Sequence, residues 1–331
     1  MRRYTWLNLL FLAMTLKSLS QPVPSASENI DFICTFGKDA EITWGDDDFI
    51  QTFFFLIPKN NKQPVYLRVF DPNCGGKHDQ LNVIEPVFNT VTRFTVFGGK
   101  GAFSNPDARS PWPKGNFKSG ILLFTATFNG DDTFDDQWFT IGPLNPAEGE
   151  FVSELDGYVF KIVSESMEGN DGNLYRYFMS QSKSANIPVE GSNAFTYKYT
   201  FRLKTGKSET AHLYPLIDEN AISIRQYNFD FDNEGIIKLY SISKNGIPVA
   251  QSGEGNWAQS EHKVTEAEKG KSMNIQLIKN QNRLNDMTFY ILNQYDQAVP
   301  FFAIPIGGVP KFKFSIGVNY DYINKKRTIG R

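Results

Sequence analysis

The sequence predicts an all-β protein built of two antiparallel, jelly-roll-like β-sandwich domains behind a cleavable signal peptide. Apolar and polar residues alternate with a period of two in many short runs, and Gly, Pro, Asn and Asp separate these runs. No segment keeps the 3.6-residue apolar period of a helix, which disfavours folds that need crossover helices. Many short strands with frequent turns are typical of sandwiches and jelly rolls.

The N-terminus has the three parts of a secretory signal. Arg2 and Arg3 precede an apolar core from Leu7 to Leu16, and the small-residue pattern Ser18-Leu19-Ser20 follows. The alternative is an uncleaved membrane anchor, but roughly ten apolar residues are too few where about twenty are needed. We therefore expect residues 1–20 to be removed and the mature chain to be secreted or periplasmic, without a transmembrane segment.

The charge of the mature chain argues against a nucleic-acid partner. The full sequence has 34 Lys and Arg against 36 Asp and Glu, and residues 1–20 contain Arg2, Arg3 and Lys17 but no acidic residue. Their removal leaves 34 − 3 = 31 basic residues against 36 acidic ones, a net charge of about −5. Nucleic acid requires a basic footprint. The basic cluster Lys325-Lys326-Arg327 lies in residues 321–331, which we interpret as a solvated basic tail.

The clearest strand signal runs from Thr196 to Leu203, where Tyr197, Tyr199, Phe201 and Leu203 share one face. Two turn signals predict hairpins, because Asn-Gly and Asp-Gly sequences tolerate the positive φ angles of tight turns. They are Lys244 to Ile247 and Asn170 to Asn173. Runs similar to the first one cover Val65 to Phe70, Thr92 to Phe97, Ile121 to Phe128, Tyr158 to Val163, Met273 to Ile278, Met287 to Leu292 and Phe312 to Val318.

The distribution of strands and turns predicts two domains. We expect a first sandwich over residues 28–165, a connecting hairpin or linker over 166–189, and a second sandwich over 190–320. The stretch from Ser180 to Glu190 is the most linker-like, because it is rich in Ser and Asn and contains Pro188.

Cys34 and Cys74 are the cysteines of the chain. An exported protein reaches a compartment that permits disulfides. A disulfide between the two cysteines would close a loop of about 40 residues, which would stabilise the folded protein by roughly 4 kcal/mol in the chain-entropy model. The alternative is two separate buried thiols, since Cys34 sits in the apolar run Phe32-Ile33-Cys34. We expect the disulfide.

Acidic turns are the most conspicuous polar feature, and they predict Ca²⁺ binding. Hard cations take six to eight oxygens, which flexible Asp, Asn and Gly loops supply. The alternative is that Asp, Asn and Gly are simply the residues that tight turns use. The candidate ligands are Asp131, Asp132, Asp135 and Asp136, which fall within six residues, and Asp46 and Asp48; further acidic turns occur at 71–79, 168–171 and 230–234.

Four tryptophans lie beside turns and are candidates for ligand binding: Trp44, Trp112, Trp138 and Trp257. Indole rings can stack on sugars or anchor a protein partner. The alternative is that they are ordinary core aromatics. Trp112 is the exception, because Pro111 and Pro113 on either side indicate a loop.

Catalytic signatures are sparse, so an enzyme is disfavoured. The three histidines, His78, His212 and His262, match no zinc spacing, and the sequence has no G-x-S-x-G elbow. A pair of carboxylates could serve a glycoside hydrolase, but an acidic sequence offers many such pairs.

The segments Phe53 to Pro58, Val65 to Pro72 and Gly75-Gly76 resemble β-sandwich domains of secreted bacterial proteins, in the style of pre-peptidase C-terminal domains. The composition, rich in Phe, Asn and Lys, resembles that of exported Bacteroidota proteins. The resemblance implies an accessory domain that binds a ligand or acts as a spacer, sometimes with Ca²⁺ in an acidic loop. It implies no catalytic residues.

We therefore expect an exported, non-catalytic protein of the bacterial cell envelope or exterior that binds carbohydrate or protein, with loops that Ca²⁺ stabilises. One alternative is a secreted hydrolase of polysaccharide or peptide, and another is a structural envelope subunit. A groove with two facing carboxylates or a His would favour the hydrolase. A face with exposed Trp and Tyr would favour sugar binding.

Overall fold

The computed structural model describes residues 22–41, 49–82 and 86–307. In these ranges the chain forms strands and short 3₁₀ helices and no α-helix, so no described helix could cross a bilayer. All strand pairs are antiparallel and form three sheets, which confirms the all-β prediction. Several predicted features lie outside the described residues: the signal peptide, Trp44, Asp46, Asp48, the strand at 312–318 and the basic tail.

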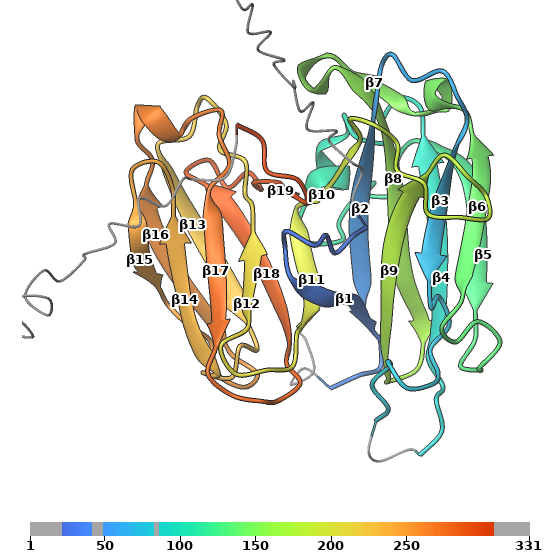
Figure 1. Ribbon diagram of the computed structural model, residues 1–331, viewed down its shortest axis with the longest axis horizontal. Helices are drawn as coiled ribbons and strands as arrows, with labels where there is room; N and C mark the ends of the chain where they lie inside the picture. Colours follow the sequence, from blue (N-terminus) through green and yellow to red (C-terminus); the bar gives the residue numbers. More distant parts are fainter. Residues whose placement is uncertain (1–21, 42–48, 83–85, 308–331) are drawn as a thin grey trace, which may run out of the picture.

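The largest sheet has eight strands in the order β16-β13-β18-β11-β1-β9-β3-β6 (Figure 1). The strands of this sheet are β16 (Trp257–Lys263), β13 (Ser223–Phe229), β18 (Asp286–Asn293), β11 (Lys198–Leu203), β1 (Ile30–Phe36), β9 (Gly172–Ser180), β3 (Val65–Phe70) and β6 (Trp138–Leu144).

The second sheet has seven strands in the order β19-β10-β2-β8-β4-β5, with β7 paired to β8, and the third has four in the order β12-β17-β14-β15. The strands of the second sheet are β19 (Phe301–Phe302), β10 (Asn193–Thr196), β2 (Ile50–Pro58), β8 (Gly157–Glu168), β4 (Val91–Gly98), β5 (Ile121–Phe128) and β7 (Glu150–Val152). Those of the third are β12 (Thr210–Leu213), β17 (Asn274–Lys279), β14 (Gly235–Tyr240) and β15 (Asn245–Val249). The 3₁₀ helices are η2 (Pro106–Arg109), η3 (Pro146–Glu148), η4 (Ser153–Leu155) and η5 (Glu266–Glu268).

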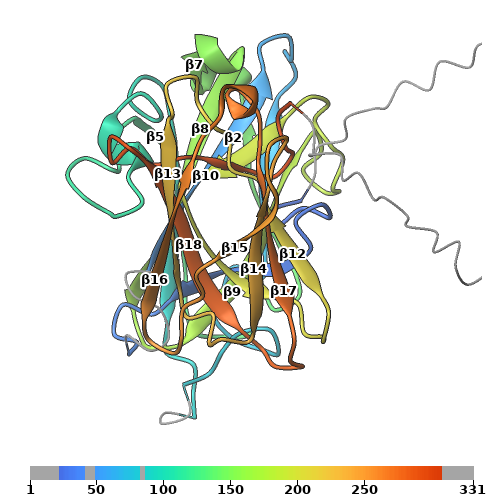
Figure 2. The ribbon, with the colours of Figure 1, turned by 90° about the vertical axis from the view of Figure 1, so that its left-hand side faces the viewer.

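The sheets pack in pairs to form two sandwiches. In Figure 2, β16, β13 and β18 stand opposite β15, β14, β17 and β12, and we call this pair the second sandwich. Strands β9, β3 and β6 cover β2, β8, β4 and β5 in the first sandwich. Inward-facing residues of each pair, such as Leu67 with Phe94 and Ile224 with Leu277, are buried in one continuous cluster.

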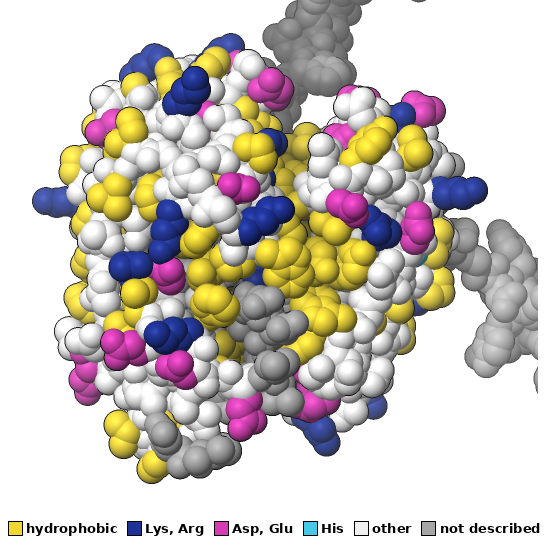
Figure 3. Space-filling model, turned by 180° about the vertical axis from the view of Figure 1, so that it is seen from behind, with side chains coloured by type: hydrophobic (Ala, Val, Ile, Leu, Met, Phe, Trp, Pro, Cys, Tyr) yellow, Lys and Arg dark blue, Asp and Glu magenta, His cyan; other side chains and the backbone are white. Residues whose placement is uncertain are grey.

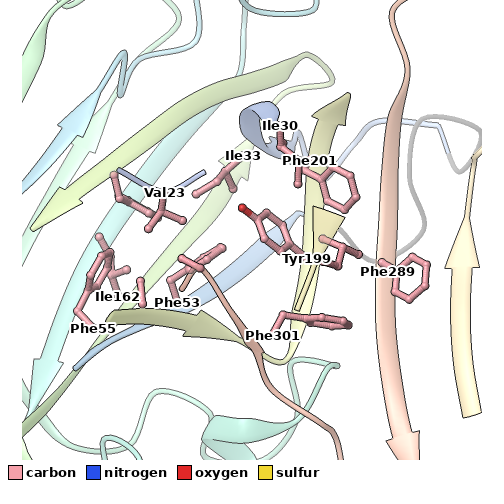
Figure 4. Packing of buried hydrophobic residues seen from close by; sticks show 14 of the residues in the cluster. Val23, Ile30, Ile33, Phe53, Phe55, Ile162, Tyr199, Phe201, Phe289 and Phe301 are labelled. Carbon is pink, nitrogen blue, oxygen red and sulfur yellow. The ribbon is translucent and has the colours of Figure 1, made fainter. Parts of the chain in front are cut away.

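Strand β1 joins the two sandwiches, because it pairs with β9 on one side and with β11 on the other. Ile33 is opposite Tyr175 in β9 and opposite Phe201 in β11. The core is continuous across this seam: Phe53 of β2 meets Tyr199 of β11 edge to face, with ring centroids 5.3 Å apart (Figure 4). One sheet and one core therefore fix the orientation of the sandwiches.

The local alternation located several strands well. The predicted runs at 65–70 and 121–128 coincide with β3 and β5. The run at 196–203 is interrupted, since β10 ends at Thr196 and β11 begins at Lys198. Tyr197 consequently packs with Phe54 and Phe195, while Tyr199 and Phe201 belong to the main core.

The two predicted hairpin turns differ from the structure. Strands β14 and β15 do pair, but Asn245 already begins β15, and residues 241–244 form the turn, in which Ser241 N donates to the Lys244 carbonyl. Residues 169–171 connect β8 to β9, which lie in different sheets, so the two strands do not form a hairpin. Side chains beyond the turns decide such pairings, and the turn residues alone do not.

The predicted disulfide is wrong, since Cys34 and Cys74 are not bonded to each other and both are buried. Cys34 points from β1 into an apolar cluster with Phe32, Phe36 and Leu174. Cys74 lies in the segment after β3, where burial raises the pKa of its thiol well above the usual value. The alternative of two buried thiols describes the protein.

Candidate functional site

The surface is hollowed between the two sandwiches, and hydrophobic side chains gather in the hollow (Figure 3). Residues from both sandwiches form an aromatic cluster, which we define as Trp112, Tyr227, Trp257 and Tyr290. Trp112 meets Trp257 edge to face at a centroid distance of 5.7 Å and Tyr290 at 5.1 Å. Tyr227 stacks nearly parallel on Tyr290 at 4.6 Å. All four rings thus touch within one site.

The strand register positions three of these rings. Tyr227 of β13 is directly opposite Tyr290 of β18, and Phe229 of β13 is opposite Trp257 of β16. Because alternate residues of a strand share a face, Tyr227 and Phe229 project to the same side of the sheet. The second sandwich therefore presents an aromatic face.

Trp112 reaches this face from the first sandwich, on the segment between η2 and β5. Its backbone N–H donates to Ser110 Oγ at 3.2 Å, which fixes the turn. The ammonium nitrogen of Lys198 in β11 lies 5.3 Å from the centre of the Trp112 ring, a cation–π contact. Trp112 and Lys198 also line a small pocket together with Thr52 of β2, Asp107 of η2 and Phe117.

A polar cavity of about 380 Å³ lies at the end of β11, β13 and β18, a size within the range of small-ligand sites. Asp286 begins β18 and shares its face with Tyr290, and Arg202 of β11 is paired with Asp286 across the ladder, so this part of the cavity lining and the aromatic cluster lie on one face of the sheet. The lining residues are Phe36, Lys77, His78, Asp79, Gln80, Leu81, Arg202, Asp230, Asp232, Glu254, Leu284, Asn285 and Asp286.

A buried ion pair holds the two walls of the cavity together. Arg202 Nη2 lies 2.6 Å from Asp286 Oδ2, and both side chains are less than a tenth exposed. The same guanidinium donates to the His78 carbonyl at 2.9 Å and to Gln80 Oε1 at 2.6 Å, both in the segment between β3 and β4. Burial opposes the charge, but Asp286 keeps the pKa of Arg202 above its usual value. Arg202 thus ties the first sandwich to the second.

Two neighbouring carboxyl groups in the cavity have raised pKa values. Burial raises the pKa of Asp230 to about 7, although Gly255 N donates to its Oδ1 at 2.8 Å, and the charges of Asp232 and Glu254 raise it further. Burial and the charge of Glu254 also raise the pKa of Asp232. A carboxyl pair of this kind can donate and accept hydrogen bonds with hydroxyl groups, and it can act as general acid and general base.

The predicted ligand-binding tryptophans separate into two groups. The structure brings Trp112 and Trp257 together in the aromatic cluster. Trp138 begins β6 at the far edge of the large sheet, where it packs on Phe70 and Phe178 below the guanidinium of Arg68. It is a packing residue and does not reach the cluster.

Sequence reasoning missed Tyr227 and Tyr290 as site residues. The alternation of Tyr227 and Phe229 indicates a strand with an aromatic face, but only the pairing of β13 with β18 places Tyr227 against Tyr290. The acidic turn at 230–234 was among the turns considered for Ca²⁺, but nothing in the sequence distinguishes Asp230 and Asp232 from the acidic residues of the other turns.

The predicted metal ligands lie in a second cluster, where residues 129–137 meet residues 71–79. Asp136 N donates to Asp71 Oδ1 at 3.3 Å, and Asn73 Nδ2 donates to Asp135 Oδ1 at 3.0 Å. Burial, and then the charge of Asp135, raise the pKa of Asp71 to about 7. The backbone carbonyl of Asp131 accepts a hydrogen bond from Asn73 Nδ2, while the side chain of Asp132 is exposed.

No known family model matches this chain, and no curated protein is similar to it in sequence. The geometry of its own residues is therefore the ground for assigning a function.

Proposed function

We propose that the protein is an exported, non-catalytic carbohydrate-binding protein whose site comprises the aromatic cluster and the adjoining acidic cavity. The observation that carries the proposal is the meeting of Trp112 with Trp257 and Tyr290 across the two sandwiches. Sugar rings present apolar C–H faces that pack on aromatic rings, while their hydroxyl groups need polar partners. The neighbouring carboxyl groups of Asp230 and Asp232 supply such partners.

The combination favours a glycan over a protein partner. A protein interface is centred on a dry apolar patch with a polar rim. Here an aromatic platform lies on the same face of the sheet as part of a polar cavity. The lining of this cavity includes the carboxyl groups of Asp79, Asp230, Asp232, Glu254 and Asp286 together with His78 and Arg202. The pattern of residues 1–20 supports export, which would place the site in contact with envelope or external polysaccharides.

Hydrolysis of a polysaccharide is the second candidate function, because the cavity contains two neighbouring carboxyl groups with raised pKa values. Burial is the main cause of both shifts, and Asp230 directly follows Phe229 at the end of β13. Glycoside hydrolases use two carboxyl groups in different protonation states. In that function Asp230 would be the protonated acid near neutral pH. A purely structural subunit would need neither group.

Binding and hydrolysis are separated by one set of measurements on the mature chain. A glycan array and retention on insoluble polysaccharides measure binding, and release of reducing ends measures hydrolysis. We expect retention that Trp257→Ala removes and Asp230→Asn keeps, with no release of reducing ends. Release that Asp230→Asn abolishes would establish the hydrolase instead. Failure of the wild type to bind any glycan would contradict both functions.

A further inference from the structure

Two acidic turns pack against each other at the edge of the first sandwich. Together they form a second candidate site, apart from the aromatic cluster and from the proposed carbohydrate site. We call residues 71–79, after β3, and 129–137, between β5 and β6, the double loop. One oxygen of Asp71, one oxygen of Asp136 and a ring nitrogen of His78 all lie within 4.8 Å of one another. The convergence of two carboxylates and an imidazole is a first sign of cation binding.

The negative charge in the double loop is only partly neutralised. Asp136, whose side chain is 48% exposed, pairs with Lys77 at 2.7 Å and with His78 at 2.8 Å. Asp71 is buried, and neither it nor Asp135 has a basic group within 4.0 Å in the described part of the chain. A buried carboxylate without a counter-charge is costly, and a bound cation would remove that cost.

Arg176 of β9 lies directly opposite Phe70 in the ladder, but among the described residues it forms no ion pair with Asp71 or Asp135 within 4.0 Å. Its Nε donates to the Asp31 carbonyl at 2.7 Å, and its guanidinium lies 4.1 Å from the centre of the Phe32 ring. The guanidinium thus packs on the Phe32 ring, and its charge interacts with that of Asp71 only at longer range.

Asn73 provides an independent sign of a ligand. Its side chain is 1% exposed, and its Oδ1 has no hydrogen-bond partner among the described residues. Its Nδ2 faces the Asp131 carbonyl and Asp135 Oδ1. The oxygen and nitrogen of an amide exchange places when χ2 rotates by half a turn. Rotation would direct Oδ1 toward two further oxygens, an arrangement that a cation stabilises.

Gly75 and Gly76 allow the two turns of the double loop to approach each other closely enough for their oxygen atoms to share a cation. A Cβ on Gly75 would lie 2.5 Å from the Asp131 carbonyl oxygen, and one on Gly76 would lie 2.2 Å from Asp135 Oδ2. Gly76 also has a φ of +71°, in the left-handed region. Any side chain at these positions would push the oxygen donors apart.

We propose that the double loop binds a hard divalent cation of the Ca²⁺ class through Asp71, Asn73, Asp131, Asp135 and Asp136. The carboxylates, the amide oxygen of Asn73 and the carbonyl of Asp131 make an oxygen-dominated donor set, which suits Ca²⁺ completed by water. His78 lies at the rim, where it is bonded to Asp136. Because His78 and Asp79 also line the acidic cavity, the cation would stiffen one wall of the cleft.

The test compares the full mature chain in CaCl₂ and in chelator. We expect Ca²⁺ at about a hundredfold excess over its dissociation constant to raise the thermal midpoint by several degrees. We also expect Tb³⁺ to bind with emission sensitised by Trp138, which follows Asp136 by two residues in the sequence, and Ca²⁺ to displace it. The emission readout is independent of stability and of glycan binding.

The matched variants are Asp136→Asn and Asp132→Asn. Both replace an acidic side chain of the same turn, but only Asp136 belongs to the proposed donor set. Both positions are exposed, so we expect both variants to fold. We expect Asp136→Asn to weaken Tb³⁺ binding at least tenfold and Asp132→Asn to leave it unchanged. Asp71→Asn, measured below the melting temperature of that variant, should abolish Tb³⁺ binding.

Three results would overturn the proposal. The first is a midpoint and a Tb³⁺ emission that do not respond to Ca²⁺ in the wild type. The second is equal loss in Asp132→Asn and Asp136→Asn. The third is a response to Zn²⁺ alone that His78→Gln removes, which would assign the site to a borderline metal held by nitrogen. Loss of glycan binding by the cleft variants would leave these measurements unaffected, so the two proposals fail independently.

Discussion

The indole rings of Trp112 and Trp257 meet at a centroid distance of 5.7 Å and an interplanar angle of 76°. Trp112 comes from the first sandwich and Trp257 from β16 of the second, so the contact exists only in the fully assembled protein. A ligand that covers both rings would bind across the seam between the sandwiches.

Substitution of Trp257 should weaken glycan binding. We expect Trp257→Ala to weaken glycan retention at least roughly tenfold, because central aromatic residues of binding sites commonly contribute about 2 kcal/mol or more. Affinity electrophoresis in polysaccharide gels measures the change. Trp138→Ala is the matched control, since Trp138 packs on Phe70 away from the cluster. Equal weakening by the two substitutions would contradict the assigned site.

The buried pair of Arg202 and Asp286 should be among the most sensitive contacts of the fold. We expect Arg202→Met to lower the free energy of unfolding by about 3–5 kcal/mol, because it leaves the buried Asp286 unpaired. Denaturant titration measures the difference. Arg225→Met is the control: Arg225 pairs with the largely exposed Asp296, and its loss should cost about 0–1 kcal/mol. A similar loss of unfolding free energy in both variants would show that Arg202 does not link the two sandwiches.

Glu28 should make the protein less stable as pH rises through neutrality. Burial raises the pKa of this carboxyl from 4.5 to about 7, against a hydrogen bond of 2.6 Å from Ser25 N. A pKa that is higher in the folded state means that the stabilising contribution is present below pH 4.5 and is lost as pH rises through about 7. The loss is on the order of 3 kcal/mol once the group is ionised.

The measurement is the free energy of unfolding at pH 5 and at pH 8 or above. We expect Glu28→Gln to be less sensitive to this change than the wild type, because the amide does not ionise. Glu261→Gln, at an exposed position of β16, should retain the wild-type slope. An unchanged slope in Glu28→Gln would mean that Glu28 is solvated in the native state.

The two thiols should be protected by the fold alone. We expect Ellman's reagent to find no reactive thiol in the native protein and both Cys34 and Cys74 in denaturant without reductant, because both side chains are buried and not bonded to each other. Reductant should leave the thermal midpoint unchanged. If the denatured, unreduced protein takes up no alkylating reagent, the cysteines are bridged after all.

The sequence by itself determined the fold class and many strand positions. Period-two alternation is a local property, since each residue's face follows from its neighbours in the chain, and it located β3 at 65–70 and β5 at 121–128. The prolines beside Trp112 likewise indicated a loop. Trp112 and Trp257 could therefore be selected as candidates from local signals.

The tertiary structure decided which of these elements meet, because strand pairing depends on residues far apart in the chain. The turn at 169–171 looked like a hairpin, yet β8 and β9 entered different sheets, where each could bury its apolar face. Cys34 was placed in the apolar cluster of β1 and not in a bond to Cys74. The pairing of β13 with β18 joined Tyr227 to Tyr290, and the passage of one sheet through β1 brought Trp112 to Trp257. Alternation fixes which way a side chain points, and only the packing of the sheets fixes what it faces.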